Sequence, residues 1–198
     1  MPPVPSKWKG VSELGQDFNT SLCNRKLIGA RFFNNGFMAA NPKTELIMNS
    51  SRDTDGHGTH AASIAIGAYV DDVSFFGYAR GTARRVAPLA RLAVYKVVWD
   101  KTLYSSDSLA AVEQAISDGA DVVSVSRRSG EIPLCNDPVA IGSFAATKHG
   151  VFVSSSAGNV GPSLGTVEKG IPLALIVQQA SLIANSRGYY PLGMATPF

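Results

Sequence analysis

Beyond residue 90, short β-rich runs alternate with amphipathic helical segments, and this alternation admits few folds. The predicted strands are residues 91–99, 121–126, 151–156 and 173–177. Strands that alternate with helices form βαβ units, which place the strands in a parallel sheet and the helices on its faces. The sequence therefore predicts an α/β fold with a doubly wound parallel sheet and helices on both faces.

Capping residues mark the ends of two predicted helices in this region. Ser106 and Asp107 offer an N-cap to the first helix, which Gly119 is placed to end. Its expected buried face consists of Leu109, Val112 and Ile116. The second helix is expected to begin where Pro138 follows Asp137, because proline suits the first helical position. The expected buried face of that helix consists of Ile141, Phe144 and Ala145.

Less regular structure is predicted for the first half of the chain. Its opening part is rich in Pro, Asn and Gly, which indicates loops with one short strand at residues 26–33. From His57 to about Tyr69 the residues are small and mostly apolar, without a helix breaker until Gly67. This pattern predicts a largely buried helix that begins at His57.

Length and composition favour one domain or part of one. The 198 residues are 45% hydrophobic, which suffices for one core but not for two domains. The net charge of +3 is spread along the chain, so no nucleic-acid or membrane partner is expected. The longest apolar run, residues 171–177, is far shorter than the roughly 20 residues of a membrane-spanning helix. The opening residues, MPPVPSKWKG, have neither a charged n-region nor an apolar h-region, so no signal peptide is expected in this stretch.

The sequence DGHGTH, at residues 55–60, contains the strongest candidate for catalysis. Glycines on both sides of His57 leave its imidazole accessible. An imidazole is the side chain best suited to take a proton near neutral pH. We therefore interpret His57 as a general base; the alternative is a buried histidine with a structural hydrogen bond.

A metal site at the same motif is the weaker interpretation. His60 lies one helical turn beyond His57, and Asp55 is nearby. This set falls short of the usual number of metal ligands, so neither a metal site nor a cofactor is predicted. His60 is interpreted as a structural residue.

A second candidate lies where the predicted strand at residues 151–156 ends. Two small residues bring Asn159 into the crevice beyond the strand, where its side-chain amide could stabilise a developing oxyanion. An asparagine in an ordinary turn is the alternative, and it is the better interpretation of this motif taken alone.

The motifs together resemble a known family. DGHGTH at a helix start, AVYKV on a strand and SSSAGN at a strand end occur in this order in subtilisin-like serine proteases, specifically the plant subtilases. Longer similar stretches are PPVPSKWKG, CNRKLIGARFF, GYARGTAR, SLAAVEQAISDGADVVSVS and SAGNVGPSLGT. Residues 1–198 are identified as the central portion of a subtilisin-like peptidase domain, with a firm match to about residue 172 and divergence over 173–198.

The resemblance implies a role for three residues. His57 corresponds to the catalytic histidine and Asn159 to the asparagine of the oxyanion hole. Ser126 corresponds to a strand position that pairs with the substrate backbone. The family acts on peptide or protein substrates without a cofactor, and the resemblance implies an extracellular or cell-wall location.

The chain also departs from the family pattern. The DTG motif of the catalytic aspartate and the GTSMA-like motif of the nucleophilic serine do not occur in it. We expect the parallel sheet to be incomplete and this chain alone to be inactive. The competing hypotheses are a non-catalytic remnant that binds peptides or a protease, and a pseudogene product. In addition, Arg127 and Arg128 stand where the family has a leucine and glycines beside its primary specificity pocket.

Cysteines and glycosylation motifs add two further expectations. Cys23 and Cys135 could form one bridge, but their spacing has no signature of a disulfide framework, and two free thiols are the favoured interpretation. The resemblance implies that Ser12 replaces a cysteine that would pair with Cys23. Asn19 and Asn49 each begin an N-glycosylation motif in a polar, turn-rich segment.

Overall fold

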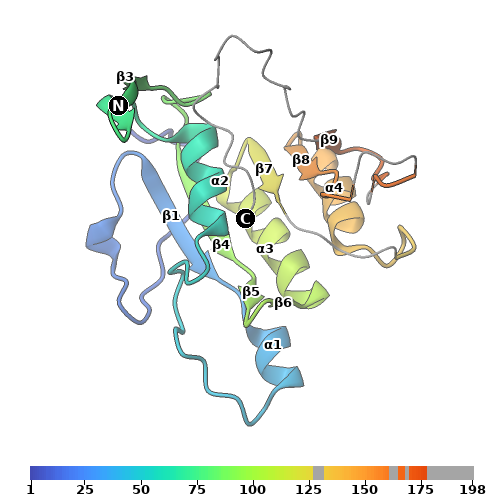
Figure 1. Ribbon diagram of the computed structural model, residues 1–198. Helices are drawn as coiled ribbons and strands as arrows, with labels where there is room; N and C mark the ends of the chain where they lie inside the picture. The colour runs from blue at the N-terminus through green and yellow to red at the C-terminus, as the bar shows by residue number, and fades with distance from the viewer. Residues whose placement is uncertain (127–131, 161–164, 168–169, 178–198) are drawn as a thin grey trace.

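The computed structural model in Figure 1 describes residues 1–126, 132–160, 165–167 and 170–177. Its helices are the 3-10 helix η1 (Thr20–Leu22) and the α-helices α1 (Asn35–Ala40), α2 (His57–Ile66), α3 (Ser105–Asp118) and α4 (Pro138–Lys148). Its strands are β1 (Leu27–Phe32), β2 (Val70–Phe75), β3 (Tyr78–Ala83), β4 (Leu92–Lys96), β5 (Val98–Trp99), β6 (Thr102–Leu103), β7 (Val122–Val125), β8 (Phe152–Ser156) and β9 (Leu175–Val177). The strand predicted at residues 91–99 is divided between β4 and β5.

The long-range strand pairs are parallel, as predicted. β1 pairs with β4, and β8 lies between β7 and β9. Helices pack on these strands, which confirms the α/β class. The parallel strands form two separate sheets over the described residues, because no ladder there joins β4 to β7.

One face of the three-stranded sheet is covered and the other is not. Val123 and Val153 contribute to the core that Ala146 of α4 completes. On the opposite face, four apolar residues are about half exposed: Val122, Phe152, Leu175 and Val177. The described part of this sheet is thus incomplete, as expected, with one face covered and one face open.

Helix α4 faces α3 through small residues. Its buried residues are Pro138, Val139, Gly142, Ser143 and Ala146. A Cβ at Gly142 would lie 3.1 Å from Cγ1 of Val112 on α3, so a larger residue there would require Val112 to move by a few tenths of an ångström. The prediction of a buried Ile141 and Phe144 was therefore wrong: these residues are 42% and 54% exposed.

Asp107 has a different role from the predicted one. Helix α3 begins two residues earlier, with Tyr104 at its N-cap, so Asp107 lies inside the first turn. Its carboxylate accepts hydrogen bonds from the backbone N–H groups of Gly36, at 2.7 Å, and Phe37, at 3.0 Å. Asp107 is 2% exposed. Its carboxylate thus satisfies free backbone N–H groups at the N-terminus of a different helix, α1.

Residues 70–83 form the antiparallel hairpin of β2 and β3, where only a loop was expected. The hairpin carries Phe75 and Tyr78 on its strands and Phe76 in its turn, and all three side chains are exposed. These exposed aromatic residues do not follow the alternation of a half-buried strand, which explains why no strand was predicted.

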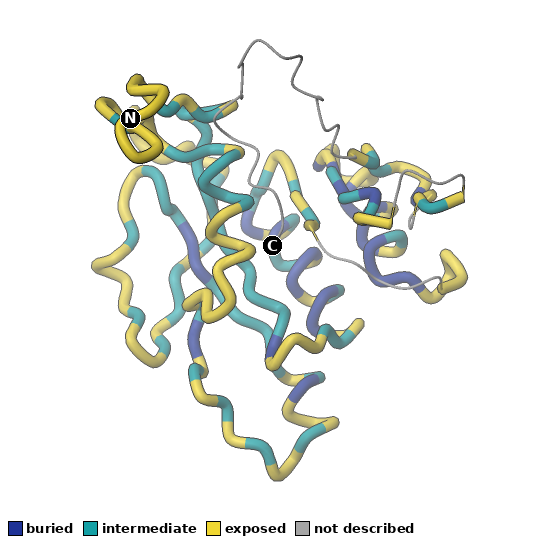
Figure 2. Tube along the Cα trace, in the orientation of Figure 1, coloured by how far each residue is buried: buried dark blue, intermediate teal, exposed yellow. Residues whose placement is uncertain are grey.

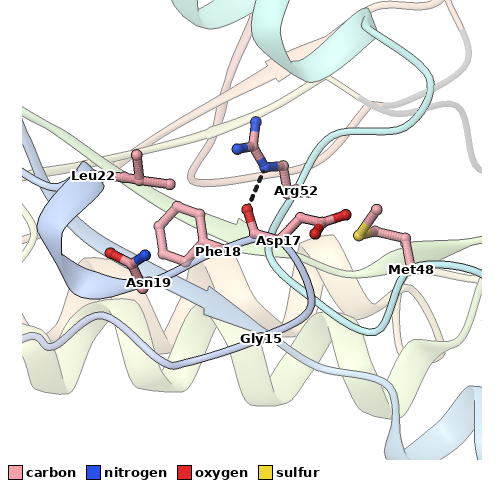
Figure 3. Close-up of a pocket in the computed structure, with 7 residues that line it drawn as sticks. All are labelled: Gly15, Asp17, Phe18, Asn19, Leu22, Met48 and Arg52. Atoms are coloured by element: carbon pink, nitrogen blue, oxygen red, sulfur yellow. Dashed lines mark hydrogen bonds between the residues drawn. The ribbon is translucent and has the colours of Figure 1, made fainter.

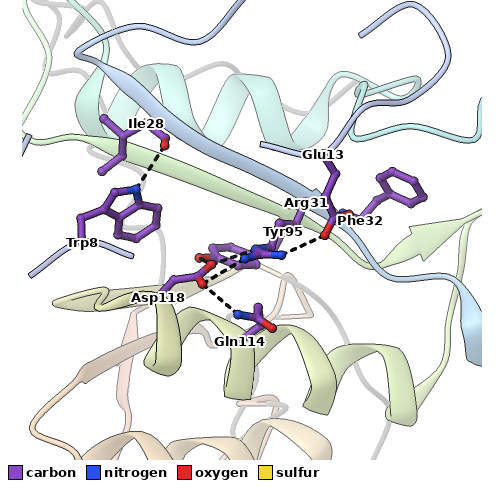
Figure 4. Close-up of polar contacts among 8 residues, drawn as sticks. All are labelled: Trp8, Glu13, Ile28, Arg31, Phe32, Tyr95, Gln114 and Asp118. Carbon is purple, nitrogen blue, oxygen red and sulfur yellow. Dashed lines mark hydrogen bonds and ion pairs between the residues drawn. The ribbon is translucent and has the colours of Figure 1, made fainter. Parts of the chain in front are cut away.

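A buried ion pair connects the N-terminal segment, β1, β4 and α3 (Figure 4). The carboxylate of Asp118 accepts hydrogen bonds from the guanidinium of Arg31, the hydroxyl of Tyr95 and the amide of Gln114. Arg31 also donates to Glu13, at 2.9 Å. Burial and the hydrogen bond to Asp118 both raise the pKa of Tyr95 above its ordinary range.

Both cysteines are free thiols, as expected. The Sγ atom of Cys23 lies 2.8 Å from the Oγ atom of Ser12. The backbone of Ser12 is held in place by an isolated parallel β-bridge to Ala30 of β1. The two side chains thus point toward one another. A disulfide bond of about 2.05 Å between these positions would require the two atoms to approach by less than about 1 Å.

We expect the substitution Ser12→Cys to create a disulfide with Cys23. Closing this short loop should raise the free energy of unfolding by about 2–3 kcal/mol under oxidising conditions. Urea denaturation with and without a reductant measures the gain, and Cys135→Ser in both proteins prevents alternative pairing. A Ser12→Cys protein whose stability does not respond to reductant would contradict the predicted geometry.

Candidate functional site

His57 is the first residue of α2, and its side chain is exposed. The preceding Gly56 adopts the left-handed conformation, with φ of 94°, which glycine tolerates without strain. The helix begins where the sequence predicts, but its burial was predicted wrongly, because none of its residues is buried (Figure 2). The imidazole is thus accessible, as a general base requires.

The carboxylate of Asp53 is bonded to the start of this helix. Oδ1 accepts the N–H groups of Asp55, at 3.0 Å, and Gly56, at 2.8 Å. Oδ2 accepts the N–H of Thr59, at 2.8 Å, and its hydroxyl, at 2.7 Å. Desolvation acts to raise the pKa of Asp53, but the hydrogen bonds from Gly56 and Thr59 outweigh it and hold this pKa well below its usual range.

Sequence reasoning did not single out Asp53. The signal was present: an acidic residue a few positions before a helix start is a common way to satisfy free N–H groups. The glycine-rich spacing between Asp53 and Thr59 allows the chain to fold back over the carboxylate.

The low pKa of Asp53 predicts an acid sensitivity of folding. A carboxylate whose pKa is lower in the folded state contributes stability above its unfolded pKa of about 3.9. This contribution is lost as the pH falls from there toward the folded pKa. Urea unfolding measured between about pH 6 and pH 2 should show a smaller acid loss in Asp53→Asn than in the parent chain. Equal acid loss in both proteins would contradict the assignment.

Ser126 and Asn159 follow neighbouring strands of one sheet. β7 and β8 are parallel and in register, with Val125 opposite Ser155, so their carboxyl ends meet at one edge. Ser126 follows β7 directly, and Asn159 follows β8 after a turn at Gly158, whose φ is 89°. Both residues are exposed at this edge, where ligands bind in sheets of this kind.

The three predicted site residues are not joined to one another. Over residues 1–126 and 132–160, no hydrogen bond links His57, Ser126 or Asn159. His57 lies on α2, whereas the other two lie beyond β7 and β8. Arg127 and Arg128, which the sequence places beside Ser126, lie outside the described residues.

A hollow that none of these three residues lines is shown in Figure 3. It is open, with a volume of about 860 Å³, and Asn19 and Arg52 lie on its wall. Arg52 donates to the backbone oxygen of Asp17 there, at 2.8 Å. Of the two predicted glycosylation sites, Asn19 lines this hollow and its side chain accepts the N–H of Ser21 at the start of η1. Asn49 is also exposed and accepts from the amide of Asn34.

Among the residues that the structure describes, every helix is too short or too polar to be a membrane span. The same residues contain no group of three or more His, Cys, Asp or Glu side chains placed to hold a metal ion.

The site belongs to an α/β protein with an accessible histidine at a helix start and an amide side chain beyond a parallel strand. A family model described as "Subtilase family" matches residues 14–185, and the chain belongs to this family of subtilisin-like serine proteases.

The similar curated proteins are plant subtilisin-like proteases. The chain is 50% identical to subtilisin-like protease SBT3 of Solanum lycopersicum over 193 residues, covering 98% of this chain and 25% of that protein. It is 52% identical to SBT1.5 of Arabidopsis thaliana over 174 residues, covering 86% of this chain and 22% of that protein. The chain therefore spans about a quarter of the length of these relatives. Among solved structures, the prenylagaramide maturation protease PagA is 23% identical with a TM-score of 0.38, covering 73% of this chain and 52% of that one.

Proposed function

We propose that this chain is the histidine-bearing and oxyanion-bearing part of a serine endopeptidase that cleaves peptide bonds in proteins. The observation that carries the proposal is the exposed His57 at the first turn of α2. In this role the imidazole takes the proton of the nucleophilic serine and later donates it to the leaving amine. Membership of the subtilase family supports this assignment.

Ser126 and Asn159 are proposed to hold the substrate. The side-chain amide of Asn159 would donate to the oxyanion that develops on the scissile carbonyl. Over the described residues, β7 is an edge strand of its sheet, so its free backbone groups can pair with an extended peptide near Ser126. These two functions belong at one edge of the sheet because cleavage requires the bound backbone to lie beside the oxyanion donor.

We further propose that the 198-residue chain does not hydrolyse peptides by itself. It contains no DTG motif and no GTSMA-like motif, and the serines of β8 lie on a central strand whose backbone is paired in register with β7 and β9. Subtilisin, a member of the same family, loses roughly 10⁶ in turnover without its serine.

A fluorophosphonate probe tests both statements, because it labels only an activated serine. We expect no labelling of the purified chain, and labelling of a longer polypeptide that supplies the two missing motifs. Stoichiometric labelling of the short chain would overturn the claim of inactivity. A longer polypeptide that is folded but never labelled would overturn the proposed peptidase function.

The free edge of β7 favours a second candidate function, the binding of peptides without cleavage. Titration of the chain with extended peptides distinguishes the two functions. Saturable binding without turnover supports a binding module, and the absence of binding at high peptide concentration removes it.

An extracellular or cell-wall location is proposed from the family. The exposed positions of Asn19 and Asn49 are compatible with glycosylation in the secretory pathway. A mass decrease after treatment of the plant-expressed protein with a glycosidase would support this proposal, and peptide mapping would identify the modified asparagine.

A further inference from the structure

Apart from the hydrogen bonds to the Asp53 carboxylate, few contacts hold the N-terminus of helix α2 in place. None of its residues is buried, and its N-cap residue, Gly56, has no side chain with which to cap it. At the C-terminal end, the N–H groups of Val86 and Ala87 donate to the carbonyls of Ile64 and Ala65. The N-terminal end, which carries His57, has the carboxylate of Asp53 instead.

Asp53 is in turn connected to the parallel strands. Lys96, the last residue of β4, donates from Nζ to the backbone oxygen of Arg52, at 2.7 Å. The same ammonium group lies 4.2 Å from the ring centroid of Trp99, a residue 3% exposed. Burial lowers the pKa of Lys96, while the charge of Asp53 acts to raise it. The end of β4 thereby fixes the backbone from which Asp53 reaches the helix.

We propose that Asp53 is a positioning residue, which fixes the first turn of α2 and with it the direction of the His57 side chain. The carboxylate accepts hydrogen bonds from Gly56, which precedes His57, and from Thr59, which follows Gly58. These two residues thus flank His57 and Gly58. A helix turn clamped on both sides of a residue leaves that residue little freedom of φ and ψ. The consequence for catalysis rests on the proposed function; the positioning itself does not.

The substitution Asp53→Asn tests the positioning in the purified chain. An asparagine has nearly the same shape but only one acceptor atom, so one of the two pairs of hydrogen bonds is lost. Asp55→Asn is the matched control. It removes the same charge at a position nearer to His57 in the sequence, and over the described residues no hydrogen bond involves the Asp55 side chain.

Nuclear magnetic resonance supplies the readout. In Asp53→Asn we expect the amide proton of Thr59 to exchange about five- to tenfold faster, the factor for loss of one helix cap. The ring resonances of His57 should shift and broaden, while those of His149 on the distant α4 stay unchanged. Unchanged indole resonances of Trp8 and Trp99, which donate to Ile28 and Phe33, show that the fold is retained.

The proposal is overturned if the His57 resonances of Asp53→Asn match those of the parent chain, or if Asp55→Asn produces the same change. In a longer polypeptide with peptidase activity, kcat should fall roughly 10- to 100-fold in Asp53→Asn and stay within twofold in Asp55→Asn. A shift of the His57 resonances in a protein without activity would support positioning and count against the proposed function. An active Asp53→Asn protein with parental kcat would count against the positioning alone.

Discussion

Replacing His57 by alanine in a longer, active polypeptide is expected to lower kcat by roughly 10⁶-fold, the loss measured for the catalytic histidine of subtilisin, whose role we propose for His57. Without the imidazole, the serine hydroxyl has no group to accept its proton, and the leaving amine has no donor. Hydrolysis of a fluorogenic peptide, measured at substrate concentrations on both sides of KM, gives kcat and KM separately.

The matched control is His149→Ala, which removes an imidazole on a different helix, α4. His149 is the C-cap residue of α4, and its ring Nδ1 lies 3.0 Å from the carbonyl oxygen of Ala145 in the same helix, so its loss should leave kcat within twofold. KM should change little in His57→Ala, because proton transfer belongs to the transition state rather than to binding. A His57→Ala protein that retains more than a hundredth of the parental kcat would remove His57 from the role of general base.

Local chemistry explains what the sequence predicted well. Asp137 accepts the N–H groups of Val139 and Ala140, and Gly119 ends α3 with a φ of 91°, as their capping preferences indicate. The strands of the parallel sheets were predicted from local sequence as well, because each is a short β-rich run. The start of α2 at His57 was also predicted, so the place of His57 at a helix N-terminus was known from the sequence.

Packing between distant segments explains what the sequence did not predict. The buried face of α4 is set by the close approach of α3, which turns Phe144 outward although its spacing suits a core position. Likewise, Asp107 caps α1 rather than its own helix, and Asp53 reaches forward to α2. In each case the partner lies on another element, so no pattern within one segment contains the information.

The ion pair of Arg31 and Asp118 is another such long-range feature, and it connects the N-terminal segment, β1, β4 and α3. Asp118 is 3% exposed, and its two oxygens accept from Arg31, Tyr95 and Gln114 at 2.8 to 3.2 Å. Its backbone oxygen accepts the N–H of Lys9 as well. A buried carboxylate with this many donors is fully satisfied, and its donors depend on it in return.

We therefore expect Asp118→Ala to lower the free energy of unfolding by about 3–5 kcal/mol, the range for breaking one side of a buried ion pair. The substitution leaves the guanidinium of Arg31 and the hydroxyl of Tyr95 without their shared acceptor. Glu13→Ala is the matched control, because Arg31 keeps Asp118 and the Glu13 side chain is 35% exposed. That control should lose no more than about 1 kcal/mol.

Urea denaturation measures these losses, and the ultraviolet absorbance of tyrosinate provides an independent readout. Because the pKa of Tyr95 is raised in the folded chain, its contribution to stability is present below the unfolded pKa of about 10 and is lost as the pH rises further. Asp118→Ala should bring the ionisation of Tyr95 down toward its ordinary range in the folded protein, whereas Glu13→Ala should not. An Asp118→Ala protein as stable as Glu13→Ala, with parental tyrosine titration, would show that Asp118 is not the acceptor that holds β1, β4 and α3 together.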